Sequence, residues 1–355
     1  MATDSNWMIY GATGYTGVLT AERAVELGER PVVAGRSEAK VRPLAERLGL
    51  PWRVFSLDDA DAVRSGLEGV DTALLIAGPF SGTSRPFLDG CLDRGVNYLD
   101  VTGEMMVFEA VLARSAEAKQ RGIVAMPGVG MDVVPSDCLA AMLKQRLPDA
   151  THLELAIWGL GGLSPGTAKT MVEGLQHGSA ERINGRIRPV PAGHATRTVR
   201  FASAERFVVA IPWGDVSTAF HTTGIPNVRT YWAMKPSAVK AMRLNDSLKG
   251  LYGLGLFQKA ARQLIEWSIK GPDEGTRQTA KVEFWGEVRN AAGQSVEGRL
   301  VTPEGYTLTA DAAVACVRGV RSGKVAPGAV TPGAGFGGEF ILSLRGVRDL
   351  SFEGP

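Results

Sequence analysis

The stretch Trp7-Met8-Ile9-Tyr10-Gly11-Ala12-Thr13-Gly14-Tyr15-Thr16-Gly17 decides the fold of this chain. A short apolar run leads into three glycines in GxxGxxG spacing, and apolar residues at helical spacing follow over 18–25, before Gly28. In a strand-turn-helix unit of this kind, small residues let the backbone approach a pyrophosphate, and the free N–H groups of the helix attract the anion. We therefore predict that residues 11–17 bind a dinucleotide. The alternative is that the glycines only form a tight turn.

The alternation of strand and helix continues along the first third of the chain. Further buried strands are predicted at 31–34, 53–56, 72–77, 96–99 and 123–126, and helical stretches separate them. Six strands interleaved with helices are typical of the α/β class with a doubly wound parallel sheet, the Rossmann fold.

After Pro127 the pattern changes to alternating polar and apolar residues. A helix at about 135–147 precedes a mainly antiparallel second sheet, whose strands we predict at 151–158, 197–201, 207–213, 216–222, 228–234 and in a hairpin over 280–302. From Tyr306 we predict a helix, a loop that contains Gly333–Gly338, and a last strand at Phe340–Leu344.

These patterns predict two domains. Residues 1–150, completed by 304–355, form the Rossmann domain. Residues 151–303 form a second α+β domain for substrate binding or oligomerisation, inserted before a C-terminal return. The sequence leaves open whether the chain is a homodimer.

Composition narrows the functional class. With 355 residues, 45% of them hydrophobic and 21% charged, and a net charge of +2, the chain is of ordinary globular type, and the absence of a basic run argues against nucleic-acid binding. The four histidines lack the spacing of a metal site, so we predict no metal. The N-terminal residues do not resemble a secretory signal, so we expect a cytoplasmic protein.

The mostly helical segment 236–270 is the one stretch that raises the question of a membrane. It contains no run of the roughly 18 apolar residues that a membrane span needs, so we predict no transmembrane segment. Packing on the second domain is the favoured interpretation, and a peripheral membrane contact is the alternative.

The residues after the second predicted strand indicate which cofactor binds. An acidic residue at this point would bond the ribose 2′-hydroxyl of NAD, but the sequence is Ala34-Gly35-Arg36-Ser37, with Lys40 one turn further on. Cationic and hydroxyl groups fit a 2′-phosphate, which predicts NADP(H), unless Arg36 only stacks on the adenine or is solvated. Asp58, after the third strand, is predicted either to meet the adenine edge or to cap the next helix.

The residues after strands four, five and six are candidates for the catalytic crevice, because ligands bind beyond the carboxyl ends of such strands. Those after strand six are Pro127-Gly128-Val129-Gly130-Met131-Asp132. Gly78-Pro79-Phe80 is placed to lie along the nicotinamide ribose. Asp100 and Glu104 are acidic groups that could transfer a proton if burial raised their pKa, or could cap the following helix. A Tyr231/Lys235 pair has the spacing of short-chain dehydrogenases, but the alternating pattern predicts a strand there, so we reject the match.

Together these motifs resemble the saccharopine dehydrogenase-like NADP-binding proteins. Later motifs resemble the branch that includes trans-acting enoyl reductases; they occupy residues 164–167, 217–226, 271–277 and 303–309. The resemblance implies a Rossmann domain and NADPH-linked reduction, and it does not imply saccharopine as substrate.

We therefore expect an NADPH-dependent oxidoreductase that reduces a C=C or C=N bond of a small or carrier-held substrate. The candidate proton donors are Asp100, Glu104, Lys169 and His221; Lys169 could instead be solvated, and His221 could be a core or edge histidine. The alternatives are a regulatory or scaffold protein that binds NADP(H) without turnover and a lipid-associated reductase.

Overall fold

The structure is a computed structural model that describes residues 6–159, 162, 164, 166, 168, 178–247, 264 and 271–354. The chain divides into two compact units. The first comprises the residues up to Val134 together with Tyr306–Phe336, and the second comprises Pro135–Gly305 and Gly337–Pro355. Residues 135–150 and 337–355, which the sequence assigned to the Rossmann domain, thus fall in the second unit.

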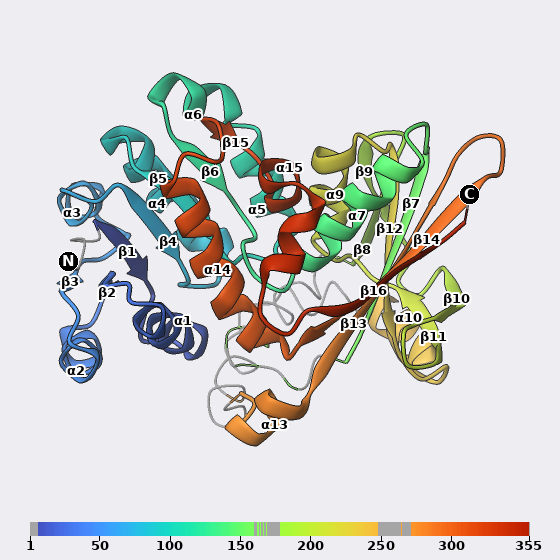
Figure 1. Ribbon diagram of the computed structural model, residues 1–355, viewed down its shortest axis with the longest axis horizontal. Helices are drawn as coiled ribbons and strands as arrows, with labels where there is room; N and C mark the ends of the chain where they lie inside the picture. The colour runs from blue at the N-terminus through green and yellow to red at the C-terminus, as the bar shows by residue number, and fades with distance from the viewer. Residues whose placement is uncertain are drawn as a thin grey trace. The chain divides into compact units, whose positions relative to one another are not determined.

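The first unit has the predicted α/β architecture (Figure 1). Its seven strands are all parallel, in the order β15-β6-β5-β4-β1-β2-β3. The strands are β1 (Trp7–Tyr10), β2 (Val32–Gly35), β3 (Trp52–Val54), β4 (Thr72–Leu75), β5 (Asn97–Asp100), β6 (Val124–Met126) and β15 (Gly328–Ala329). The helices are α1 (Tyr15–Glu26), α2 (Glu38–Leu48), α3 (Ala60–Gly66), α4 (Phe80–Arg94), α5 (Met105–Leu112), α6 (Ser115–Arg121), α14 (Gly305–Arg321) and α15 (Pro332–Phe336).

Strand order in this sheet fixes where a ligand can bind. The central strand β1 pairs with β2 on one side and with β4 on the other, and its residues Trp7, Met8 and Ile9 have no exposed surface. Strands buried on both faces read as continuous apolar runs, as this one does. Because the direction of winding reverses between β1 and β4, the crevice of a doubly wound sheet lies at their carboxyl ends, beside Gly11.

The second unit is built on a nine-stranded sheet of mainly antiparallel strands. Its strands are β7 (His152–Trp158), β8 (Ser179–Ile183), β9 (Arg186–Val190), β10 (Thr196–Arg200), β11 (Glu205–Ala210), β12 (Asn227–Ala233), β13 (Lys281–Arg289), β14 (Ser295–Pro303) and β16 (Arg348–Glu353). Its helical segments are α7 (Val134–Arg146), α9 (Asp215–Thr223), α10 (Ala238–Ser247), α13 (Glu274–Thr279) and the 3-10 helix η2 (Gly338–Ser343).

Close packing explains why α7 belongs to the second unit. A Cβ atom at Gly286 of β13 would lie 2.8 Å from Leu143 Cδ1, and one at Gly298 of β14 would lie 2.9 Å from Leu139 Cδ1. The two glycines therefore let α7 lie directly against the sheet. At the other end of the chain, β16 pairs with β14, which places the C-terminal residues in the same unit.

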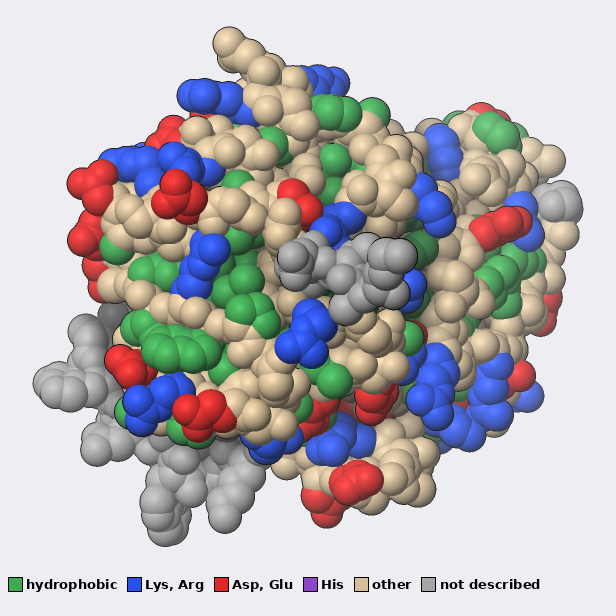
Figure 2. Space-filling model, turned by 60° about the vertical axis from the view of Figure 1, so that its left-hand side comes forward, with side chains coloured by type: hydrophobic (Ala, Val, Ile, Leu, Met, Phe, Trp, Pro, Cys, Tyr) green, Lys and Arg blue, Asp and Glu red, His purple; other side chains and the backbone are tan. Residues whose placement is uncertain are grey.

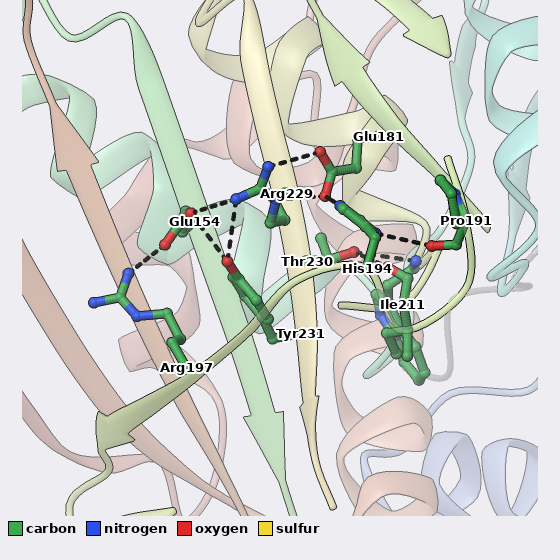
Figure 3. Close-up of polar contacts among 10 residues, drawn as sticks. Glu154, Glu181, Pro191, His194, Arg197, Ile211, Arg229, Thr230 and Tyr231 are labelled. Atoms are coloured by element: carbon green, nitrogen blue, oxygen red, sulfur yellow. Dashed lines mark hydrogen bonds and ion pairs between the residues drawn. The ribbon is translucent and has the colours of Figure 1, made fainter. Parts of the chain in front are cut away.

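The opposite face of this sheet carries a buried network of charges (Figure 3). Arg229 lies between Glu154 and Glu181, with contacts of 3.3 Å to Glu154 Oε1 and 3.0 Å to Glu181 Oε2, and Arg197 pairs with the other oxygen of Glu154. The hydroxyl of Tyr231 donates to Glu154 Oε1 at 3.1 Å. Tyr231 thus lies on strand β12, as predicted when its spacing from Lys235 was rejected as a catalytic motif.

Three local predictions were wrong or incomplete. Residues 216–222 form part of helix α9 and not a strand, although the β-branched residues favour a strand locally. The consecutive residues 215–219 are all buried, so the alternation in the sequence does not correspond to one buried and one exposed face. The predicted strand at Phe340–Leu344 is mostly the 3-10 helix η2, and the predicted loop at Gly333–Gly338 begins with α15.

The hairpin of β8 and β9 was missed. Its turn is Asn184-Gly185, with φ of 50° and 77°, which is the strongest local signal for a two-residue hairpin. Most of the predicted helical segment 236–270 lies outside the described residues, apart from the start that includes α10. In the part of the chain that the structure describes, no helix is both long and apolar enough to cross a membrane.

Candidate functional site

The glycine turn at residues 11–17 is shaped by close backbone contacts. Gly11 has φ of +88°, and a Cβ atom there would lie 2.7 Å from the backbone nitrogen of Ala77. A Cβ atom at Gly17 would overlap the carbonyl oxygen of Gly11, so this glycine lets α1 pack against the turn. At Gly14, by contrast, φ is −75° and the nearest atom to a Cβ would be Gly11 O at 3.5 Å. The fold therefore needs glycine at positions 11 and 17, whereas position 14 has room for a larger residue.

The N-terminus of α1 has the features of an anion site. Gly14 is its N-cap residue and, as a glycine, has no side chain with which to cap it, and no acidic residue lies in its first turn. Free N–H groups and the positive end of the helix dipole favour a negatively charged group at this point. This geometry fits the pyrophosphate of a dinucleotide, for which residues 11–17 would supply backbone N–H groups.

The residues that follow β2 fit a second anion. Arg36 is exposed and makes no hydrogen bond or ion pair within the described residues, and Lys40 is exposed on the first turn of α2. Ser37 is the N-cap residue of α2, but its hydroxyl makes no capping bond. On the face of the molecule in Figure 2, basic and acidic side chains are intermingled.

Asp58 does not cap the next helix. The N-cap of α3 is Asp59, whose Oδ1 accepts hydrogen bonds from the backbone N–H groups of Asp61 and Ala62 at 2.9 and 3.1 Å. Asp58 is exposed and accepts a hydrogen bond from Ser56 Oγ at 3.1 Å.

The charges of Arg36 and Asp58 both act on the hydroxyl of Tyr10 at the end of β1. Burial raises the pKa of Tyr10 to about 12, while the charge of Arg36 lowers this pKa and that of Asp58 raises it.

The segment after β4 is held by Glu104, which lies after β5. Glu104 Oε1 accepts from the backbone N–H of Phe80 at 2.7 Å, and Oε2 accepts from that of Ser81 at 2.9 Å. Glu104 is the N-cap residue of α5, but its side chain does not cap α5; it caps α4 instead. Gly78, Pro79 and Phe80 are thereby fixed at the crevice edge of the sheet.

Asp100 is completely buried at the end of β5. Its Oδ1 accepts from the N–H groups of Thr102 and Gly128, both at 2.9 Å, and its Oδ2 accepts from the hydroxyl of Tyr98 at 2.5 Å. Burial raises the pKa of Asp100 from 3.8 to about 6, and these three hydrogen bonds oppose the shift. Asp100 does not cap a helix, since its bonds go to the loops after β5 and β6.

Asp132 was not assigned to the site from the sequence, although it follows the sixth strand. Burial raises its pKa to about 6. A Cβ atom at Gly103 would lie 3.0 Å from Asp132 Oδ2, so this carboxyl group lies beside the loop that carries Asp100 and Glu104. The only feature of the sequence that could have indicated Asp132 as a site residue is its position in the loop after β6, at the carboxyl edge where ligands bind.

The two remaining candidates belong to the second unit. His221 is exposed in the last turn of α9, with its ring 5.5 Å from that of Phe220 in an edge-on arrangement. Lys169 lies outside the described residues.

Comparison with known proteins supports the interpretation of the first unit. Residues 7–126 match the family model of the saccharopine dehydrogenase NADP binding domain. A putative trans-acting enoyl reductase of Mycobacterium tuberculosis is 30% identical over 186 residues, which cover 48% of this chain and 44% of the relative. A trans-acting enoyl reductase of Mycobacterium leprae is 32% identical over 148 residues, 39% of this chain and 35% of the relative. The match thus spans less than half the length of these relatives.

The fold also resembles a solved structure over nearly its whole length. Apo saccharopine dehydrogenase (L-Glu forming) from Saccharomyces cerevisiae has a TM-score of 0.63 with 11% sequence identity, covering 98% of this chain and 99% of the yeast chain. At this identity the likeness shows the fold alone. The resemblance that the motifs indicated, and NADP(H) as the expected cofactor, are confirmed: residues 7–126 match the model of the saccharopine dehydrogenase NADP binding domain, and the chain is similar to trans-acting enoyl reductases.

Proposed function

We propose that this chain is an NADPH-dependent reductase that acts on a C=C or C=N bond of a small or carrier-held substrate. The observation that carries the proposal is the pair of anion sites at the carboxyl edge of the first sheet: the uncapped N-terminus of α1 at Gly14, and Arg36 without an acidic partner in the described residues. The pyrophosphate fits the first site and the 2′-phosphate fits the second. The match of residues 7–126 to an NADP-binding domain supports the same cofactor.

The chemistry divides between the cofactor and the protein. Bound NADPH supplies the hydride, and the protein orients the acceptor and supplies one proton, so that a double bond becomes a single bond with a hydrogen on each atom. The names of the curated relatives favour a C=C bond in an enoyl group held by a carrier.

The proton donor remains a prediction among four side chains. Asp100 and Glu104 are engaged by backbone N–H groups, His221 is exposed on α9, and Lys169 lies outside the described residues. Asp132 joins them as a candidate because burial raises its pKa to about 6, near the operating range of a general acid.

Titration with NADPH and with NADH tests the cofactor assignment. We expect Arg36→Ala to weaken NADPH binding about 10-fold or more, because a charge-assisted contact to a phosphate contributes roughly 1.5–3 kcal/mol, and to leave NADH binding unchanged. Arg42→Ala is the matched control, since Arg42 is exposed on α2, the helix that follows Arg36, and contacts Glu38 at 3.4 Å. Equal effects of Arg36→Ala on both nucleotides would contradict the 2′-phosphate assignment.

The reaction is tested by following NADPH oxidation with enoyl thioesters, free and carrier-bound, and with imines. Turnover only with the enoyl compounds would support C=C reduction, and turnover only with imines would support C=N reduction. Tight NADPH binding without turnover of any of them would favour the non-catalytic regulatory alternative.

A further inference from the structure

We propose that Asp100, Thr102 and Glu104 form a polar link that holds the loops after β4, β5 and β6 in place around the nicotinamide end of the cofactor. Asp100 and Glu104 are then positioning residues and not proton donors. This inference rests on the proposed function, because it assumes that the crevice at these strand ends holds NADPH.

The link begins within the loop after β5. Asp100 Oδ1 accepts from the N–H of Thr102 at 2.9 Å, and Thr102 Oγ1 accepts from the N–H of Glu104 at 3.0 Å. Asp100 and Thr102 have no exposed surface. Because a buried hydrogen-bonded network of this kind is costly to break, the loop from 100 to 104 has one preferred conformation.

Two bonds extend the link to the loop after β6. The side chain of Asp100 accepts from Gly128 N–H at 2.9 Å, and its backbone carbonyl accepts from Val129 N–H at 2.7 Å. A Cβ atom at Gly128, where φ is +75°, would lie 2.7 Å from both Phe108 and Val133. The turn at 128–129 is thus fixed by Asp100 from one side and by packing from the other.

Three further bonds extend the link to the loop after β4 and from there to the glycine turn. Glu104 caps α4 through Phe80 and Ser81, and Thr83 Oγ1 in the same turn donates to the carbonyl of Ala77 at 2.6 Å. Ala77 is the residue whose backbone nitrogen leaves no room for a side chain at Gly11. A shift of the segment 77–81 would therefore disturb the glycine turn as well.

The same contacts argue against proton donation by these two carboxyl groups. Both oxygens of Glu104 accept from the backbone N–H groups of Phe80 and Ser81, so this carboxyl group is oriented towards the N-terminus of α4. Asp100 is completely buried with both oxygens engaged, so it lacks surface on which a substrate could meet it. The residues act on the reaction through the loops that they hold.

Four variants test the link: Glu104→Ala, Glu104→Gln, Asp100→Asn and the control Glu68→Gln. Glu68 is 76% exposed and lies between α3 and β4, at the opposite edge of the sheet. We would measure NADPH affinity by nicotinamide fluorescence, and hydrogen–deuterium exchange of the backbone N–H groups in 11–17, 76–81 and 127–131.

Glu104→Ala is expected to weaken NADPH binding at least 10-fold and to speed exchange in 76–81. Glu104→Gln should fall between Ala and wild type, because Gln offers one acceptor oxygen for two N–H groups. Asp100→Asn should remain within about 3-fold of wild type, because its oxygen can still accept from Thr102 and Gly128 while Tyr98 accepts from its amide.

Unchanged exchange in 76–81 and NADPH affinity within 2-fold of wild type for Glu104→Ala would overturn the proposal. If wild type itself fails to bind NADPH, the proposed function fails, and the exchange data still decide whether Glu104 holds the loop.

Discussion

Two alanine substitutions in the glycine turn should separate cofactor binding from folding. Position 14 tolerates a Cβ atom within the protein, since φ is −75° and the nearest atom would be 3.5 Å away. That Cβ would nevertheless stand at the N-terminus of α1, where the pyrophosphate is expected. Position 17 does not tolerate a Cβ atom, which would overlap Gly11 O and approach Ala12 to 2.8 Å.

The two substitutions should affect different quantities: Gly14→Ala mainly the NADPH affinity, and Gly17→Ala mainly the free energy of unfolding. Gly14→Ala should change the free energy of unfolding by less than about 1 kcal/mol, because it creates no clash and alters only an N-cap residue. It should weaken NADPH binding about 10-fold or more, because losing even one helix N–H bond to a phosphate costs roughly 1.5–3 kcal/mol. Gly17→Ala should reduce the free energy of unfolding by about 1–3 kcal/mol or more, since the atoms that it meets are backbone atoms that cannot rotate away.

Urea denaturation and NADPH titration of the two variants and wild type provide the test. Gly14→Ala with wild-type stability and weak NADPH binding, beside Gly17→Ala with reduced stability, would support the assignment of position 14 to the phosphate. Wild-type NADPH affinity in Gly14→Ala would refute it, because the approach of the pyrophosphate to this turn would then not depend on a bare backbone.

Two further predictions concern stability. The native pKa of Asp100, about 6, lies above its ordinary 3.8, so its contribution favours the folded state below about pH 3.8 and is lost as the pH rises through 6. At about 1.4 kcal/mol per pH unit, this contribution to the free energy of unfolding amounts to about 3 kcal/mol. Urea denaturation of wild type and Asp100→Asn between pH 4 and 7 should therefore give different pH dependences of the free energy of unfolding. Parallel pH profiles for the two proteins would contradict the prediction. Glu154→Ala should lower the free energy of unfolding by about 1–3 kcal/mol, because Arg197 and Arg229 lose one partner but keep Glu287 and Glu181. Equal denaturation midpoints for Glu154→Ala and the exposed control Glu46→Ala would argue against that network.

The sequence was sufficient for the architecture of the first unit because its signals are local and repeated. Strands β1, β2, β4 and β6 are short buried runs, and helices α2, α4 and α6 end at glycines in the left-handed conformation, Gly49, Gly95 and Gly122. The glycine turn predicts the position of the dinucleotide site for the same reason.

The second unit was less predictable because its elements depend on distant partners. The residues of α9 have a strand-like composition, yet they form a helix in which the consecutive residues 215–219 are all buried by the surrounding structure. The domain boundary was misplaced at α7, since nothing in its own sequence indicates that Gly286 and Gly298 form its packing surface. The β8–β9 hairpin, by contrast, was available from Asn184-Gly185.

Glu104 shows that a sequence can indicate the position of a residue without indicating which groups its side chain contacts. Its position before α5 suggests a cap for α5, the helix that follows it in sequence, but its side chain caps α4 because β4 and β5 are neighbours in the sheet. The contact between Glu104 and α4 also distinguishes two helix N-termini at the carboxyl edge of the sheet, those of α4 and α1. A carboxylate already occupies the N-terminus of α4, which disfavours a second anion there, whereas α1 has neither a capping side chain nor an acidic residue in its first turn. Of these two helices, α1 is therefore the one whose dipole can act on a phosphate, which is why we assign the pyrophosphate to α1 in our proposal.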